Sequence, residues 1–338
     1  MSGGGSSRPP AAAGEGRALT RIEDLVAHGL VPASASAQLK AVAERFQVRL
    51  TSHVVAAIGA GGGLDGGRGG EPDPIARQFV PDVAEAIIAP EELIDPIGDE
   101  VHAKVPGIVH RYPDRVLLKP THLCQVYCRF CFRREVVGPE AGSLDDAELD
   151  AALGYIAGRP EIFEAILTGG DPLVLSDRRL GRILAGLEAI EHLGVIRIHS
   201  RALIADPGRA TDDFVRLLRR RVAVWLVLHV NHPRELTPDV AAAIGRLVDG
   251  GVPLLAQTVL LKGVNDDAAT LEALMRTLVR LRVKPYYLHH LDLAAGTSHF
   301  RVSVARGQEL SAHLRGRVSG ICQPTYVLDI PGGHGKAP

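Results

Sequence analysis

The sequence of 338 residues has few cysteines, almost no net charge and no long apolar run. Its four cysteines show no pairing pattern, which argues against a disulfide-rich secreted protein, and the N-terminus lacks the basic-then-apolar order of a secretory signal. A formal net charge of −1 gives no reason to expect nucleic acid or a membrane surface as a partner. No apolar run approaches the roughly 20 residues of a membrane-spanning helix. These absences predict a cytoplasmic location.

The composition and local patterns divide the chain into four regions. Residues 1–18 are small and polar and predict a disordered tail. Residues 19–110 predict an N-terminal helical region that contains a Gly-rich loop at 59–70. Residues 111–320 repeat an apolar run followed by a helical pattern, and residues 321–338 form a C-terminal segment with a Gly-rich turn. With 46% hydrophobic residues, the chain is long enough to bury a sizeable core.

The repeat in the third region predicts the fold. The candidate strands are 115–119, 163–168, 194–199, 222–230, 252–261 and 283–289. The candidate helices are 144–157, 176–192, 211–220, 238–249, 267–281 and 306–315. Strands that alternate with helices pair in parallel, and strands covered by helices on a curved sheet are apolar along most of their length. The sequence therefore predicts an α/β fold with a curved, partial barrel.

Three of the four cysteines fall in one short stretch. Cys124, Cys128 and Cys131 have the spacing C-x3-C-x2-C, while Cys322 lies far away in sequence. Clustered cysteines without secretory features indicate a metal site. An iron–sulfur cube with three protein thiolates would keep one iron open for another ligand. The alternatives are a zinc knuckle completed by Cys322 or a histidine, and three buried apolar thiols.

Polar residues follow or end the predicted strands, where a parallel barrel places its active site. After the cysteines, these residues are Gly169, Gly170, Asp171, Arg201, His229, Gln257, His289 and Asp292. Taken alone, a histidine or glutamine at a strand end is more often a hydrogen-bonding group of the core. Their shared placement favours a functional site.

Longer motifs carry a resemblance to a known family. C-x3-C-x2-C with Phe130 just before its last cysteine resembles the signature of the radical S-adenosylmethionine (radical SAM) enzymes. The motifs VPG (105–107), HRYPDR (110–115), LTGGDP (167–172) and PGGHGK (331–336) resemble the lysine 2,3-aminomutase family over residues 72–338. The resemblance implies a partial (β/α)6 radical SAM barrel and an isomerase that converts L-lysine to β-lysine.

The resemblance also implies three cofactors. Cys124, Cys128 and Cys131 would hold a [4Fe-4S] cluster whose open iron binds S-adenosyl-L-methionine (SAM). The SAM site would include Gly169, Gly170, Asp171, Arg201, His229 and Gln257. Lys336 would bond covalently to pyridoxal 5′-phosphate (PLP), with Arg111 and Arg115 on the phosphate. His289 stands where the family has a tyrosine near the pyridine ring.

Substrate choice follows from charge. The resemblance assigns Arg133 to the substrate carboxylate, and Asp292 and Asp329 to the distal ammonium group of lysine. Two carboxylates would repel a second acidic group, which disfavours glutamate. The alternatives are a 2,3-aminomutase for another amino acid, such as glutamate, and a non-catalytic iron–sulfur or zinc protein that senses redox state.

The chain also departs from its family. Founding members have a C-terminal extension with zinc-binding cysteines, so we expect no zinc here and no such tetramer, which leaves a homodimer as the expected assembly. The short form resembles the branch that makes β-lysine for elongation factor P, although Asp329 is often altered in that branch. The resemblance further implies an electron donor such as a flavodoxin or ferredoxin.

Overall fold

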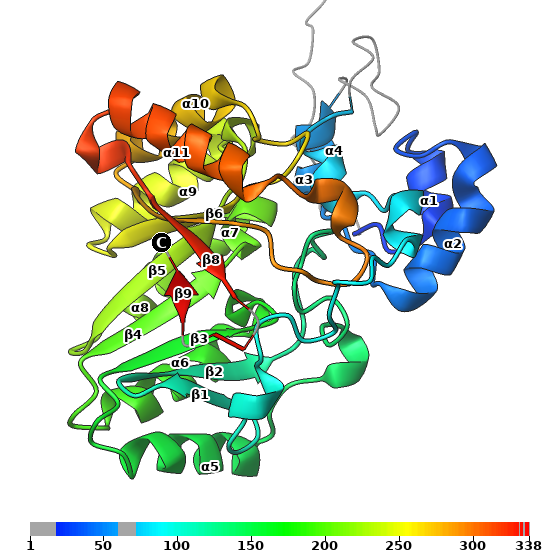
Figure 1. Cartoon of the computed structure of the whole chain (residues 1–338). Helices are drawn as coiled ribbons and strands as arrows, with labels where there is room; N and C mark the ends of the chain where they lie inside the picture. Colours follow the sequence, from blue (N-terminus) through cyan, green and yellow to red (C-terminus); the bar gives the residue numbers. More distant parts are fainter. Residues whose placement is uncertain (1–17, 60–71, 331, 334, 338) are drawn as a thin grey trace, which may run out of the picture.

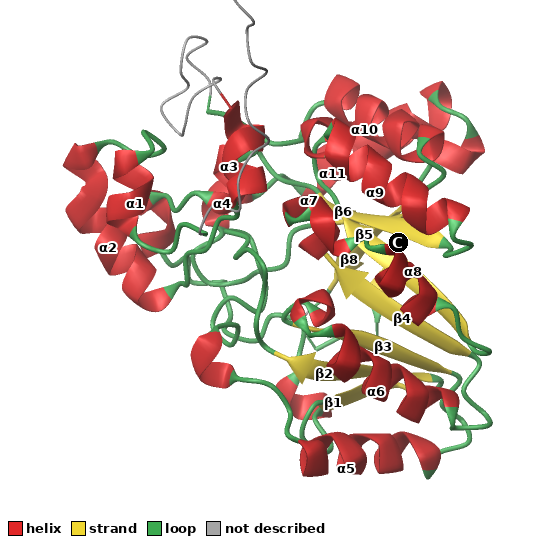
Figure 2. Ribbon diagram, turned by 180° about the vertical axis from the view of Figure 1, so that it is seen from behind, coloured by secondary structure: helices red, strands yellow, loops and turns green. Residues whose placement is uncertain are grey.

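The computed structural model describes residues 18–59, 72–330, 332–333 and 335–337, so most of the predicted tail and of the Gly-rich loop lies outside the described residues. Nine strands form a curled sheet whose order follows the sequence from β1 to β9, and helices cover its outer face (Figure 1, Figure 2). The strands are β1 (Ile108–Tyr112), β2 (Arg115–Thr121), β3 (Glu164–Gly169), β4 (Val195–Ser200), β5 (Ala223–His229), β6 (Leu254–Val259), β7 (Lys284–His289), β8 (Thr325–Asp329) and β9 (Lys336–Ala337).

Six strand–helix units make up the barrel, as predicted, and β2 to β8 pair in parallel. The helices that follow β2 to β7 are α5 (Asp146–Ala157), α6 (Asp177–Glu188), α8 (Asp212–Leu218), α9 (Pro238–Asp249), α10 (Ala268–Arg280) and α11 (Val304–Arg317). Local signals place several helix starts: the Thr237 side chain accepts from Val240 N, and Pro238 occupies the first turn of α9. The main apolar core lies between these helices and the sheet. The partial (β/α)6 barrel is thus confirmed.

Three strands and one short helix were not predicted. Strand β1 pairs antiparallel with β2, β8 extends the sheet beyond β7, and β9 pairs antiparallel with β8. Helix α7 (Ala202–Ala205) follows β4 directly. β9 has only two residues, which is too short for any sequence pattern to reveal. In Figure 1, β8 and β9 form the end of the sheet opposite to β1 in strand order.

The N-terminal region packs beside the barrel. It contains α1 (Ile22–Ala27), α2 (Ser36–Arg45), α3 (Ser52–Ile58) and α4 (Ala76–Phe79). Its apolar core also includes Val126 and Ala205, so the region lies against the loop that carries the three cysteines. Residues 72–104 have helical spacing in sequence but form only α4 and two 3₁₀ turns, Val83–Ala86 and Glu100–His102, because their prolines prevent longer helices.

Short 3₁₀ helices fill many connections. They are Ala33–Ala35, Val83–Ala86, Glu100–His102, Pro139–Ala141, Pro172–Val174, Pro207–Arg209, Pro233–Glu235, Ser298–Phe300 and Gly320–Cys322.

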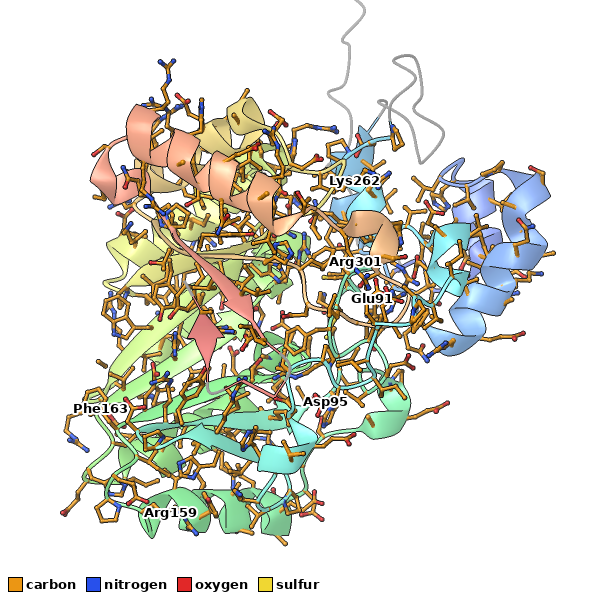
Figure 3. The ribbon with its side chains drawn as sticks, viewed as in Figure 1. Glu91, Asp95, Arg159, Phe163, Lys262 and Arg301 are labelled. Carbon is orange, nitrogen blue, oxygen red and sulfur yellow. The ribbon has the colours of Figure 1, made fainter. Side chains whose placement is uncertain are left out.

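Ion pairs fasten the irregular segment 72–104 to the barrel. Arg301, in the connection between β7 and α11, pairs with Glu91 and with the buried Glu92, and Figure 3 labels Arg301 and Glu91 side by side. Glu92 also accepts from the backbone N–H groups of Gly296 and Thr297. The segment therefore has a fixed position despite its lack of regular structure, and two of its residues, Glu85 and Asp99, reach the site described next.

Candidate active site

A cavity of about 880 Å³ lies inside the curl of the sheet, and all sixteen residues predicted from the sequence line it. They are Arg111, Arg115, Cys124, Cys128, Cys131, Arg133, Gly169, Gly170, Asp171, Arg201, His229, Gln257, His289, Asp292, Asp329 and Lys336. Because parallel strands end at one edge of the sheet, side chains distant in sequence meet there. The volume is within the range of sites for drug-sized ligands and cofactors.

The three cysteines of the cluster loop, residues 122–134, are free and line this cavity. Burial raises the pKa of all three thiols, that of Cys131 to about 11, and the neighbouring thiols add to the shift of Cys124 and Cys131. Such thiols become thiolates when they bind a metal, since a coordinating metal deprotonates them. Three free, half-buried thiols on one loop are a donor set that fits an iron–sulfur cluster.

A zinc site completed by Cys322 does not fit the fold. Cys322 lies in the apolar core and precedes β8, whereas the cluster loop follows β2 at the opposite edge of the parallel sheet. Cys322 therefore cannot complete a site with the other cysteines. Within the described residues, no three His, Cys, Asp or Glu side chains are placed to hold a single metal ion. The ligands of an iron–sulfur cube bind different irons and so do not converge on one point.

Two arginines of the cluster loop, Arg129 and Arg134, bind a buried carboxylate instead of a cysteine. Arg129 donates to both carboxylate oxygens of the fully buried Glu85, and Arg134 pairs with the same carboxylate. The side chain that donates to a cysteine sulfur is Arg201, whose Nη1 lies 3.2 Å from Sγ of Cys128. Glu85 was not predicted, because no sequence pattern links it to the cluster loop.

The Gly169-Gly170-Asp171 turn packs closely against the backbone at the start of the cluster loop. A Cβ atom on Gly170 would lie 2.3 Å from the carbonyl oxygen of Leu123, and Gly169 has a φ of 109° that side chains disfavour. The Asp171 carboxylate accepts four hydrogen bonds, from Leu173 N, Ser200 Oγ, Arg201 N and Ala202 N. Glycine allows the close approach of the two backbones. Asp171, which follows β3, accepts hydrogen bonds from residues at the end of β4 and so links the ends of the two strands.

The histidines at the strand ends are neutral. Burial and, to a smaller extent, the charge of the nearby Lys336 lower the pKa of His289 to about 3. Burial also lowers the pKa of His229 well below its usual value, with a smaller contribution from Arg201. The Nε2 atoms of both rings, and Nε of Arg201, are buried and have no hydrogen-bond partner among the described residues. These atoms are therefore available to a ligand in the cavity.

The β8–β9 hairpin places Lys336 over the cavity. Lys336 stands opposite Asp329 in the antiparallel pair, and its amine contacts the Asp329 carboxylate. Arg111 donates from Nη1 to Asp329 at 3.1 Å and from Nη2 to the Gly333 carbonyl at 2.7 Å. Arg115 stacks 3.9 Å from the ring centroid of Tyr112 and pairs with Asp114. Lys336 is thus held in place rather than frayed.

The predicted substrate-binding groups also line the cavity. Arg133 donates from Nε to Asp99 at 2.8 Å and from Nη1 to Thr168 at 3.2 Å. Burial raises the pKa of Asp292 to about 7, although Lys336 lowers it in part. Asp99 was missed in the sequence because it precedes the strand repeat, and only the folded chain shows that it contacts Arg133.

Comparison with known proteins assigns this arrangement to a family. The Radical SAM superfamily model matches residues 118–275. An L-lysine 2,3-aminomutase from Fusobacterium nucleatum is 43% identical over 78% of this chain and 62% of its own length. A protein from Aquifex aeolicus, provisionally named an L-lysine 2,3-aminomutase, is 40% identical over 79% of this chain and 72% of its own length. A glutamate 2,3-aminomutase from Clostridioides difficile is 38% identical over 79% of this chain and 63% of its own length.

The chain belongs to the lysine 2,3-aminomutase family of radical SAM proteins. The matched part of this chain covers 62% of the length of the Fusobacterium relative, which is less than two thirds. Membership in the radical SAM superfamily implies a [4Fe-4S] cluster and SAM. In the part of the chain that the structure describes, no helix is long and apolar enough to cross a membrane.

Proposed function

We propose that this protein is an isomerase, a 2,3-aminomutase that converts L-lysine to β-lysine. One observation carries the proposal: a single cavity holds Lys336, the cationic Arg133 and two carboxylates, Asp292 and Asp329. Lysine has a carboxylate at one end and an ammonium group at the other, and these charges complement that arrangement. Relatives named L-lysine 2,3-aminomutase support the same substrate.

Cys124, Cys128 and Cys131 would hold the cluster, which leaves one iron for SAM. When bound, the cluster and SAM supply radical chemistry, and PLP supplies the ring that carries the migrating nitrogen. The unpartnered Nε of Arg201 and Nε2 of His229 would bind polar groups of SAM. Gly169, Gly170, Asp171 and Gln257 complete that side of the cavity. An external one-electron donor such as a flavodoxin or ferredoxin would reduce the cluster.

Lys336 would hold PLP covalently, because its amine faces the cavity on a fixed hairpin. Arg111 and Arg115 would bind the phosphate. Arg111 would have to share its donors, since Nη1 and Nη2 already bind Asp329 and Gly333. His289, whose pKa is lowered by burial and by the charge of Lys336, would lie beside the pyridine ring in its neutral form.

Arg133 and Asp292 would set the substrate preference. Arg133 is oriented by Asp99 and Thr168, so its position is fixed before a ligand binds. The Asp292 carboxyl has no ion pair among the described residues, and an ammonium group of the substrate would relieve the cost of its burial. A glutamate side chain would bring a third negative charge close to Asp292 and Asp329.

Product analysis under strict anaerobiosis tests the proposal. Protein with a reconstituted cluster, PLP, SAM and dithionite receives labelled L-lysine in one tube and labelled L-glutamate in another. We expect β-lysine in the first tube and no β-amino acid in the second. β-Glutamate in the second tube alone would show that the relative from Clostridioides difficile is the better guide to the substrate.

A variant of Lys336 separates the two cofactor assignments. Lys336→Ala should keep the iron content and visible absorption of the cluster, lose the absorbance of the covalent PLP adduct, and make no β-lysine. Cys128→Ala is the matched control, because it should lose the cluster absorption instead. Retained adduct absorbance in Lys336→Ala would contradict the assignment of Lys336.

A further inference from the structure

The guanidinium group of Arg201 is buried directly behind the cluster loop. Its Nη1 donates to Sγ of Cys128 at 3.2 Å, and the residue is only 5% exposed. Its central carbon lies 4.4 Å from the ring centroid of Phe79 and 5.4 Å from that of Phe130. Two aromatic rings therefore restrict where the guanidinium can lie, and one of its N–H groups points at a predicted iron ligand.

Two further side chains, from separate parts of the chain, fix the other end of this guanidinium. Nη2 donates to Oε2 of Glu235 at 2.6 Å and to Oε1 of Gln78 at 2.6 Å. Glu235 ends the 3₁₀ turn Pro233–Glu235 after β5, and Gln78 lies in α4 of the N-terminal region. Both are fully or almost fully buried. The direction of Nη1 is therefore set by contacts that do not touch the cavity.

Glu235 is itself held firmly. Its Oε1 accepts from the backbone N–H groups of Asn231 and His232 and from Nε2 of Gln78. A buried arginine needs a compensating charge, and Glu235 supplies it. A carboxylate fixed by three donors cannot follow a moving arginine, so it keeps the guanidinium in a single position.

Such a hydrogen bond affects how readily a cluster accepts an electron. Reduction adds negative charge to the cluster and its sulfur ligands, and a donor to a ligand sulfur stabilises that charge. Hydrogen bonds to ligand sulfurs are one of the means by which a protein sets the reduction potential of a cluster.

We propose that Glu235 is a positioning residue that, together with Gln78, directs Arg201 toward Sγ of Cys128 and so raises the reduction potential of the bound cluster. The proposal rests on the cluster assigned under the proposed function but not on the amino-acid substrate or on PLP. The step it concerns is the gain of one electron by the cluster, with no bond formed or broken.

The test is an EPR-monitored redox titration of the reconstituted protein without SAM or amino acid. In Arg201→Met, the equilibrium constant for reduction should fall at least tenfold, which corresponds to about 59 mV for a one-electron couple. Glu235→Ala should lower the potential in the same direction, because Arg201 loses its orientation. In the Arg201→Met background, Glu235→Ala should no longer lower it.

The sign of the Glu235→Ala shift distinguishes the proposal from a simple charge effect. If Glu235 acted only through its negative charge, its removal would favour reduction and raise the potential. A raised or unchanged potential in Glu235→Ala would overturn the proposal, as would an unchanged potential in Arg201→Met. Glu92→Ala is the matched control, since Glu92 is also a buried carboxylate but binds Arg301 away from the cysteines, and it should leave the potential unchanged.

Conservative variants keep the test decisive if Arg201→Met fails to take up iron. In Arg201→Lys, the side chain keeps its positive charge but lacks the planar guanidinium that contacts Cys128 and Glu235 together. The reduction potential of the cluster should therefore fall by less than in Arg201→Met. A potential equal to that of the wild type in Arg201→Lys would overturn the proposal. A wild-type protein that binds no iron after reconstitution would instead contradict the proposed function.

Discussion

Replacing Asp292 with asparagine should stabilise the folded protein at alkaline pH and at the same time remove its binding site for an ammonium group. Burial raises the pKa of this carboxyl to about 7, the charge of Lys336 opposes the rise, and that of Asp329 adds to it. No hydrogen bond or ion pair to the Asp292 carboxyl is found among the described residues. The ionised form is therefore poorly compensated until a cation enters the cavity.

The sign and size of the effect follow from linkage. The folded protein holds the Asp292 proton up to about pH 7, whereas the unfolded chain releases it near the ordinary value of 3.8. Stability therefore declines as the pH rises between these values, and the full cost applies above pH 7. A difference of about three pKa units corresponds to about 4 kcal/mol. This is an upper bound, because Asp292 faces the cavity and water there screens its charge.

Denaturant unfolding at pH 5 and pH 8 measures the difference in the free energy of unfolding between the wild type and Asp292→Asn. At pH 8, Asp292→Asn should be more stable than the wild type by up to about 4 kcal/mol, and at pH 5 by only about 1–2 kcal/mol. Asp329→Asn is the matched control, because it leaves Arg111 and Lys336 without their carboxylate and should destabilise the protein at both pH values.

Isothermal calorimetry of the same variants connects stability to binding. Asp292→Asn should lose most of its affinity for L-lysine but not for norleucine, which has no distal amine. A stability change that is equal at pH 5 and pH 8, or a destabilisation at pH 8, would refute the argument that Asp292 is desolvated.

Two other substitutions test the cluster loop. Gly170→Ala would place a Cβ atom 2.3 Å from the backbone oxygen of Leu123, so the loop must shift, and iron bound per chain after reconstitution should fall severalfold; full iron occupancy would contradict the predicted clash. Glu85→Gln should lower the free energy of unfolding at pH 7 by about 3–5 kcal/mol, because it leaves the buried guanidinium groups of Arg129 and Arg134 without an anion. Unfolding at the wild-type denaturant concentration would show that the ion pairs contribute no net stability.

The sequence alone was sufficient for the six strand–helix units of the barrel and for sixteen of the residues that line its cavity. Alternating apolar runs and helical patterns predicted β2 to β7 and their helices, because both periodicities depend on near neighbours in the chain. The carboxyl ends of parallel strands meet at one edge, so residues such as Gly169, His229 and Asp292 could be assigned to one site before any coordinates were known. The spacing of the cysteines and the longer motifs predicted the family.

Tertiary structure decided what those residues contact. Arg111 was predicted to bind phosphate, and in the fold its donors bind Asp329 and the carbonyl oxygen of Gly333. No sequence signal links Glu85 or Glu235 to an arginine, because their partners Arg129 and Arg201 are 44 and 34 residues away and the pairing depends on how separate segments pack. Short-range patterns predict which face of a strand or helix is buried, but the partner of a buried charge is set only when the whole chain has folded.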